Sequence, residues 1–338
     1  MQLSEEFHSL TGLRKVLKAG IVAFMATMTV LVPADVANSA NSATQTSRVT
    51  QLVKTQGQLS ALIRAGVLES SITSAQFTSA YSSMKEKGWG AGPPTGCSLQ
   101  TSEPIADYRG LKVCGIYGDT KSKRLIVLVG DSHAGIFRWV FNAFGVLHHY
   151  RVQLLERDGC QMAEIPEYYP TCTSWGSNAA HIINLEKPRA VIISDSSLST
   201  AYNNLSSSSY AAGQTAFYLD IKHSGRLVFQ IGDTSAPSQN IPSIALESTC
   251  ISQHLSNLQL CSLSAQAEAA SFEQNQAGLA AAGGARFIPV NQLFCTALVC
   301  PPIIDGNLVY WDGEHVSPPF LELIAPVIDN LMVAHGLN

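Results

Sequence analysis

The chain has 338 residues, of which 46% are apolar and 14% are charged, and its formal net charge is −4. These values are typical of a globular protein with one large core, and they exclude the strongly basic surface that proteins use to bind nucleic acids. We therefore expect one main domain and no nucleic-acid partner.

The first forty residues have the layout of an export signal. Three basic residues precede an apolar run over residues 19–32, and small residues follow it up to Ala40. The run is short for a spanning helix, which needs about 20 apolar residues, so an uncleaved anchor and a buried helix stay open as alternatives. We predict that residues 1–40 are a signal peptide or an N-terminal membrane anchor, and that the protein is secreted or otherwise extracytoplasmic.

Residues 41–57 are rich in Ser, Thr, Asn, Gln and Ala, which predicts a flexible linker after the export segment. Apolar residues then recur at helical spacing over residues 59–68, and more weakly over residues 74–87. Glycines and prolines between Gly88 and Gly96 interrupt this pattern. The sequence thus predicts a helical N-terminal extension over residues 58–95.

The main domain, residues 96–338, alternates short apolar runs with longer helical patterns. Such alternation is typical of an α/β fold in which helices cover both faces of a central parallel sheet. We therefore predict a three-layer α/β domain. Its strands are expected at residues 125–129, 150–155, 190–193, 227–231 and 286–290, and its helices at residues 136–144, 178–185, 265–282 and 321–332.

Eight cysteines lie along the sequence as four close pairs. In an exported protein an even number of cysteines indicates disulfides, and pairing of neighbours is the simplest of many connectivities because each bond would close one short loop. Zinc is the alternative, but no CxxC pair or ligand-spaced histidine supports it, so we expect neither a metal nor another cofactor. The predicted disulfides are Cys97–Cys114, Cys160–Cys172, Cys250–Cys261 and Cys295–Cys300.

A candidate nucleophile follows the strand predicted at residues 125–129. That strand leads into the turn Gly130-Asp131-Ser132-His133, and a helical pattern comes next. In an open parallel sheet, ligands bind beyond the carboxyl ends of the strands, so Ser132 would face a substrate there. Its N–H, at the start of a helix, could donate to a developing oxyanion. Because Asp and Ser are also common helix caps, a purely structural turn is the alternative.

The matching base is expected near the C-terminus, in the segment Trp311-Asp312-Gly313-Glu314-His315. A serine hydroxyl needs a histidine to take its proton and a carboxylate to orient the imidazole. Asp312, three residues before His315, can reach the imidazole within one turn of the loop. Glu314 is the rival carboxylate, and an exposed acidic loop with an incidental histidine is the alternative. The sequence predicts Ser132, His315 and Asp312 as a catalytic triad.

The segment around Ser132 and the segment around His315 together resemble a known family. Residues 129–134 and 312–315 are similar to the first and last sequence blocks of the SGNH hydrolases, and residues 114–119, 158–160 and 187–191 resemble the SGNH domain that is fused to type 3 membrane acyltransferases. The resemblance implies a flavodoxin-like α/β/α fold, a Ser-His-Asp triad and work on O-acyl groups of envelope glycans. Since the sequence lacks a cluster of membrane-spanning segments, a separate membrane acyltransferase is a candidate partner.

One part of the family pattern does not carry over. In SGNH hydrolases the oxyanion hole combines the N–H of the nucleophile with a glycine of the second block and an asparagine of the third. Gly159 fits the glycine, but Ser194-Asp195-Ser196 stands where the asparagine is expected. Ser196 is the candidate third donor, with Asn203 as the alternative.

The sequence therefore predicts an extracytoplasmic serine esterase or O-acyltransferase. It would work through an acyl-enzyme on O-acyl groups, acetyl above all, of an envelope polysaccharide or another acylated glycan. The departure in the oxyanion hole motivates the alternative, a non-catalytic glycan-binding or scaffold protein on the same fold. A lipase for long-chain esters is a third hypothesis, although no apolar lid is recognisable in the sequence.

Overall fold

The computed structural model describes residues 52–87, 115–165, 172, 174–196, 207–234, 247–265 and 267–338, which belong to one compact unit. The predicted export segment, most of the predicted linker and the predicted Cys97–Cys114 disulfide lie outside these residues. Within the described segments, no helix is both long and apolar enough to cross a membrane.

A six-stranded sheet forms the centre of the domain, with the strand order β1-β3-β2-β4-β5-β7. The short edge strand β1 pairs antiparallel with β3, and all other neighbours in this sheet are parallel. The central strands β2 and β4 are buried at every position, as expected for strands covered on both faces. The strands are β1 (Ile116–Gly118), β2 (Leu125–Gly130), β3 (Arg151–Glu156), β4 (Ala190–Ser194), β5 (Leu227–Ile231) and β7 (Arg286–Ile288).

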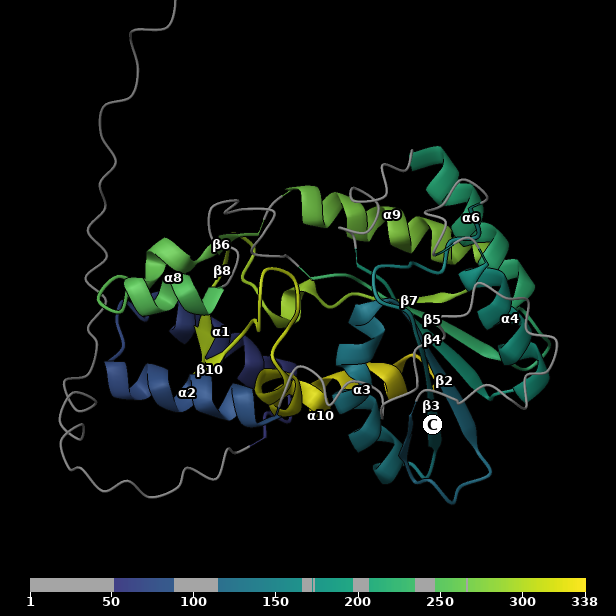
Figure 1. The fold of residues 1–338 in the computed structure, drawn as a ribbon, viewed down its shortest axis with the longest axis horizontal. Helices are drawn as coiled ribbons and strands as arrows, with labels where there is room; N and C mark the ends of the chain where they lie inside the picture. Colours follow the sequence, from purple (N-terminus) through teal and green to yellow (C-terminus); the bar gives the residue numbers. More distant parts are fainter. Residues whose placement is uncertain are drawn as a thin grey trace, which may run out of the picture. The chain divides into compact units, whose positions relative to one another are not determined.

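Helices cover both faces of this sheet, so the domain has three layers (Figure 1). Ile126 and Leu128 of β2 lie in one core with side chains of α3 and α10, and the alternate residues of β2 lie in a second core under α4, α6 and α9. The predicted three-layer, flavodoxin-like fold is confirmed. The covering helices are α3 (Ser132–Leu147), α4 (Trp175–Glu186), α6 (Ser207–Asp220), α9 (Ala267–Gly283) and α10 (Pro318–Ala334).

α6 is a helix that the sequence pattern does not indicate. Its buried face combines Tyr210, Phe217 and Tyr218 with Gly213 and Gln214, so two of these five residues are small or polar. The buried amide of Gln214 and the hydroxyl of Tyr218 both donate to Gln230 Oε1, over 3.4 and 2.9 Å. Because polar contacts replace apolar ones, the hydrophobic spacing of a covering helix is weak here.

The N-terminal helix α1 (Gln56–Leu68) packs into the first core. It begins with a capping box, in which the Thr55 side chain accepts from the Gln58 N–H and the Gln58 side chain accepts from the Thr55 N–H. Leu59 and Ile63 are buried in the same core as α3 and α10. This part of the predicted extension therefore shares its apolar contacts with the α/β domain.

A third, smaller core joins α2 to the segment beyond β5. Met84 of α2 packs there with the paired Cys250 and Cys261 and with Ile303 and Leu308. The elements of this core are α2 (Ser74–Lys87), α8 (Glu247–Gln253), the short 3-10 helix η3 (Leu258–Cys261) and the two-residue strands β9 (Ile303–Ile304) and β10 (Asn307–Leu308). The 3-10 helix η4 (Asn291–Leu293) and the strands β6 (Leu263–Ser264) and β8 (Val299–Cys300) contribute instead to the first core.

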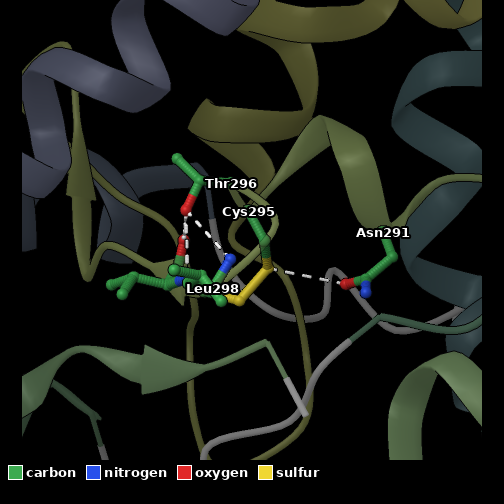
Figure 2. Close-up of a disulfide and its surroundings, with 6 residues drawn as sticks. Asn291, Cys295, Thr296 and Leu298 are labelled. Carbon is green, nitrogen blue, oxygen red and sulfur yellow. Dashed lines mark hydrogen bonds between the residues drawn. A yellow bond between two sulfur atoms is a disulfide. The ribbon is translucent and has the colours of Figure 1, made fainter. Parts of the chain in front are cut away.

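Disulfides close three short loops in the described residues. They join Cys160 to Cys172, Cys250 to Cys261 and Cys295 to Cys300, which are the neighbours that the sequence pairs. Figure 2 shows the last of these, where the Thr296 hydroxyl donates to the Val299 carbonyl over 2.9 Å inside the closed loop. Each bond restricts the unfolded chain by closing a short loop, and the second of them joins α8 to η3.

Candidate active site

Ser132 lies at the carboxyl end of β2, where the chain turns into α3. β2 has β3 on one side and β4 on the other, so the connections that leave these strands diverge at this point. In doubly wound sheets such a switch point is where ligands bind. Gly130, with a φ of 155°, allows the turn, and a Cβ at this position would lie 1.9 Å from the Ser194 carbonyl oxygen of β4.

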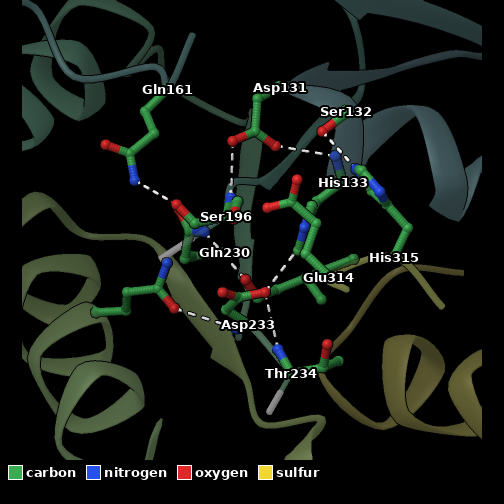
Figure 3. Close-up of polar contacts among 12 residues, drawn as sticks. Asp131, Ser132, His133, Gln161, Ser196, Gln230, Asp233, Thr234, Glu314 and His315 are labelled. Atoms are coloured by element: carbon green, nitrogen blue, oxygen red, sulfur yellow. Dashed lines mark hydrogen bonds and ion pairs between the residues drawn. The ribbon is translucent and has the colours of Figure 1, made fainter. Parts of the chain in front are cut away.

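The three predicted triad residues form one chain of hydrogen bonds. His315 Nε2 lies 2.9 Å from Ser132 Oγ, and His315 Nδ1 lies 2.9 and 2.8 Å from the two carboxylate oxygens of Asp312. Ser132 and His315 face each other in Figure 3. When Nδ1–H donates to Asp312, Nε2 is the acceptor that faces the serine proton, which is the geometry that nucleophile activation requires.

The loop that carries His315 is held by contacts with its own backbone. Asp312 Oδ1 accepts from the N–H groups of Glu314 and His315, both over 2.9 Å, and the Trp311 N–H donates to the His315 carbonyl over 2.7 Å. Burial favours a raised pKa for the Asp312 carboxyl, but the hydrogen bonds and the charge of His315 outweigh it, so its pKa lies below the usual value. Asp312 is therefore a stable anion beside the imidazole.

Asp131 caps α3, as the structural alternative for this turn proposes, and it does so while Ser132 contacts His315. One carboxylate oxygen accepts from the His133 N–H over 2.9 Å, and the other accepts from the Ser196 N–H over 2.8 Å. The nucleophile turn is thereby tied to the residues that follow β4. Helix capping and the contact of Ser132 with the base are thus compatible in one turn.

His133 is buried directly behind the triad. Its Nδ1 lies 2.9 Å from Asp233 Oδ1, and its ring centroid is 5.3 Å from that of His315. Burial alone favours a lowered pKa, but Asp233, Asp131 and Glu314 together raise the pKa of His133 to about 9. The side chain is therefore an imidazolium ion at neutral pH.

Gly159 and Ser196, the two candidate oxyanion donors besides Ser132, follow the two strands that flank β2. Gly159 follows β3 with a φ of 69°, and a side chain added there would meet no atom within 4 Å, so it borders open space. Ser196 is buried after β4, where its N–H donates to Asp131 and its carbonyl accepts from Gln161 Nε2 over 2.5 Å. Asn203 lies outside the described residues.

A buried carboxyl at this edge has no signal in the sequence. Asp195 is fully buried after β4; burial raises its pKa well above the usual value, and the nearby Asp131 raises it further. Asp195 therefore holds its proton more tightly than an ordinary carboxyl, close to the turn that carries Ser132. The described residues contain no group of three His, Cys, Asp or Glu side chains placed to hold a metal ion.

Glu156, at the end of β3, should make the stability of the domain depend on pH. Burial, together with the charge of Asp158, raises its pKa from 4.5 to about 8. The folded state thus keeps a proton that the unfolded chain loses, and the free energy of unfolding should fall as the pH rises from about 4.5 to about 8. Glu156→Gln should remove this decline and raise the free energy of unfolding at pH 8 by roughly 2 kcal/mol or more.

Urea unfolding of wild type and Glu156→Gln, at pH 5 and at pH 8, measures this effect. The exposed Glu86→Gln is the matched control and should leave both curves unchanged within about 0.5 kcal/mol. A stability difference between wild type and Glu156→Gln that is equal at the two pH values would contradict the assignment.

Comparisons with known proteins identify the domain. A model of the SGNH domain (fused to AT3 domains) matches residues 96–330, more than half of the chain. The periplasmic domain of a lipopolysaccharide acetyltransferase from Salmonella ser. Paratyphi A has a similar structure, with 15% identity, a TM-score of 0.55, and coverage of 76% of this chain and 99% of that one. A GDSL-like lipase from Bacteroides thetaiotaomicron VPI-5482 aligns with 11% identity and a TM-score of 0.39, over 63% of this chain and 89% of the lipase. No curated protein matches the chain.

The matched segment contains all three residues of the hydrogen-bonded chain, Ser132, His315 and Asp312. At this level of identity, the likeness to the Salmonella domain supports a common fold and leaves function to the residues of the site. The chain therefore belongs to the family described as the SGNH domain (fused to AT3 domains).

Proposed function

We propose that this protein is an extracytoplasmic serine esterase or O-acyltransferase, with Ser132 as nucleophile, His315 as base and Asp312 as the orienting carboxylate. The observation that carries the proposal is the hydrogen-bonded chain from Ser132 Oγ through His315 to Asp312, at 2.9 and 2.8 Å. The position of Ser132 beyond the carboxyl end of β2 supports it, because substrates can reach this edge.

The first half-reaction forms an acyl-enzyme. Ser132 Oγ attacks the ester carbonyl while its proton moves to His315 Nε2. The tetrahedral intermediate then collapses: the bond to the leaving alcohol breaks, and that oxygen takes the proton from His315. Asp312 stays ionised throughout and stabilises the imidazolium that forms between the two steps.

The second half-reaction releases the acyl group. Water or a sugar hydroxyl gives its proton to His315 and attacks the acyl carbonyl, after which the proton returns to Ser132 Oγ as the new ester or acid leaves. For the oxyanion we propose the N–H groups of Ser132 and Gly159, with the hydroxyl of Ser196 as third donor. A hydroxyl in place of the family's asparagine amide suits this role because it can rotate towards the charge.

We further propose that the natural substrates are O-acyl groups, acetyl above all, of envelope glycans. This rests on the family, whose members are fused to AT3 domains, and on the likeness to a periplasmic lipopolysaccharide acetyltransferase domain. In this proposal residues 1–40 export or anchor the protein, the segment before α1 is a linker, residues 58–95 extend the domain and residues 96–338 are catalytic. A separate membrane acyltransferase would supply the acyl groups.

Turnover of p-nitrophenyl acetate by the full chain, kept under oxidising conditions, tests this function. We expect a burst of p-nitrophenol and a protein mass increased by one acetyl group, both absent in Ser132→Ala. Adding a de-O-acetylated polysaccharide as acceptor separates transfer to sugar from hydrolysis. A folded wild type that neither cleaves the ester nor transfers acetyl, yet binds glycan, would support the non-catalytic alternative instead.

A further inference from the structure

Two contacts hold the nucleophile turn, one on each side of Ser132. The residue before it, Asp131, accepts from the Ser196 N–H beyond β4 over 2.8 Å. The residue after it, His133, contacts Asp233 beyond β5 over 2.9 Å. Figure 3 shows both contacts beside the pair of Ser132 and His315. The catalytic serine thus lies between anchors on the next two strands of the sheet.

The anchor at Asp233 is itself fixed. Its side chain and that of His133 are each 5% exposed, and Asp233 Oδ1 also accepts from the Thr234 N–H over 2.8 Å. The Asp233 N–H donates to Gln276 Oε1 of α9 over 3.3 Å. A carboxylate held by its own loop and by a covering helix offers a rigid acceptor to His133.

The surroundings of His133 are charged on several sides. Asp131 faces it from its own turn, Asp233 from the end of β5 and Glu314 from the loop of the base, with the His315 ring also in contact range. A side chain buried among these groups has a strong preference for one orientation, since turning the ring away would cost the buried Asp233 carboxylate its contact with His133 Nδ1.

We infer that His133 and Asp233 are positioning residues, which fix the first turn of α3 so that Ser132 Oγ stays in line with His315 Nε2. The inference rests on the proposed function of Ser132. Neither residue touches the reacting atoms; their role is the placement of the serine. A misplacement of about 1 Å costs on the order of a hundredfold in rate, so a loosened turn should appear in kcat.

The experiment compares His133→Phe with His133→Asn in the full chain. Phenylalanine keeps a ring but removes the donor, whereas the asparagine amide can place an N–H near the position of Nδ1. We expect His133→Phe to lower kcat for p-nitrophenyl acetate roughly 10- to 100-fold with KM changed less than about twofold, and His133→Asn to recover most of the loss. Adding Asp233→Asn to His133→Phe should cause little further loss, because the contact is already gone.

His148→Phe is the matched control, since it removes a second histidine-aspartate contact of the same helix. His148 Nε2 lies 2.6 Å from Asp329 Oδ1 at the other end of α3. This variant should lower the melting temperature but leave kcat per active site unchanged, with active sites counted from the p-nitrophenol burst.

The outcomes separate the inference from the proposed function. If wild type and Ser132→Ala turned over p-nitrophenyl acetate at the same rate, the proposed function would be overturned, and this inference with it. A reactive wild type whose kcat survives His133→Phe, or falls equally in His148→Phe, would overturn the inference alone. A loss confined to His133→Phe and recovered in His133→Asn supports it.

Discussion

Asp312→Asn is expected to lower kcat about ten-thousandfold while leaving KM nearly unchanged. Asp312 accepts the Nδ1–H of His315 through both oxygens, which keeps Nε2 as the acceptor of the Ser132 proton. An asparagine can turn its amide towards Nδ1 and favour the other tautomer, whose Nε2–H cannot take a proton. The imidazolium would also lose its counter-ion, so the loss falls on the transition state.

The rate of acylation by p-nitrophenyl acetate, followed in single turnover from pH 5 to pH 10, measures this loss. Glu314→Gln is the matched comparison, because Glu314 is the other carboxylate of the loop while the Nδ1 contacts are made by Asp312. We expect Glu314→Gln to retain the rate within about tenfold, as a change in nearby charge alone would give. If Asp312→Asn and Glu314→Gln lost the same acylation rate, Asp312 would not be the carboxylate that orients His315.

Gly130→Ala is expected to destabilise the protein by about 4 kcal/mol or more. The new Cβ would lie 1.9 Å from the Ser194 carbonyl oxygen and 3.1 Å from Ala134 Cβ, and the φ of 155° is strained for any other residue. β2 and β4 are paired through Gly130 and Ser194, so the clash cannot be relieved without separating two central strands. Because Ser132 follows two residues later, activity should be lost together with stability.

Urea unfolding provides the measurement, and Gly306→Ala provides the control. Gly306 also has a positive φ, of 73°, but a Cβ there would meet nothing within 4 Å. Gly306→Ala should therefore lower the free energy of unfolding only by the backbone strain, about 1 to 2 kcal/mol. If the two variants lost the same stability, the close approach of β2 and β4 would not be what demands glycine at position 130.

The parts of the fold that follow local patterns can be predicted. The continuous apolar runs of β2 and β4 indicate buried parallel strands, and the weak helical spacing over residues 74–87 matches the bounds of α2. β1 is not predictable in this way, because three residues that follow one glycine and end in another carry no pattern, and only the antiparallel pairing with β3 makes them a strand. α6 escapes prediction since its buried face depends on Gln214 meeting Gln230 from another element.

In the site, too, local motifs can be predicted from the sequence, whereas contacts between distant residues cannot. Ser132, Asp312 and His315 stand in short motifs, so the sequence alone is enough to name them as candidates. The surrounding support comes from residues far apart in the chain: Ser196 donates to Asp131 across 65 residues, and Gln161 donates to Ser196 across 35. Such contacts leave no local periodicity, so the sequence can suggest a packing role for His133 but not its partnership with Asp233.

The long stretch of sequence between Ser132 and His315, the proposed nucleophile and base, affects when activity can appear during folding. Ser132 and His315 are 183 residues apart, and the base stands on the loop that leads into α10, the last helix. The serine turn draws on β2, α3 and the anchors beyond β4 and β5, but the contact with His315 Nε2 can close only after nearly the whole domain has been made. Contacts of such long range form late, because the closure of a long loop opposes them. Esterase turnover would therefore report completed folding. A chain truncated before residue 315 would contain Ser132 but lack the histidine that takes its proton.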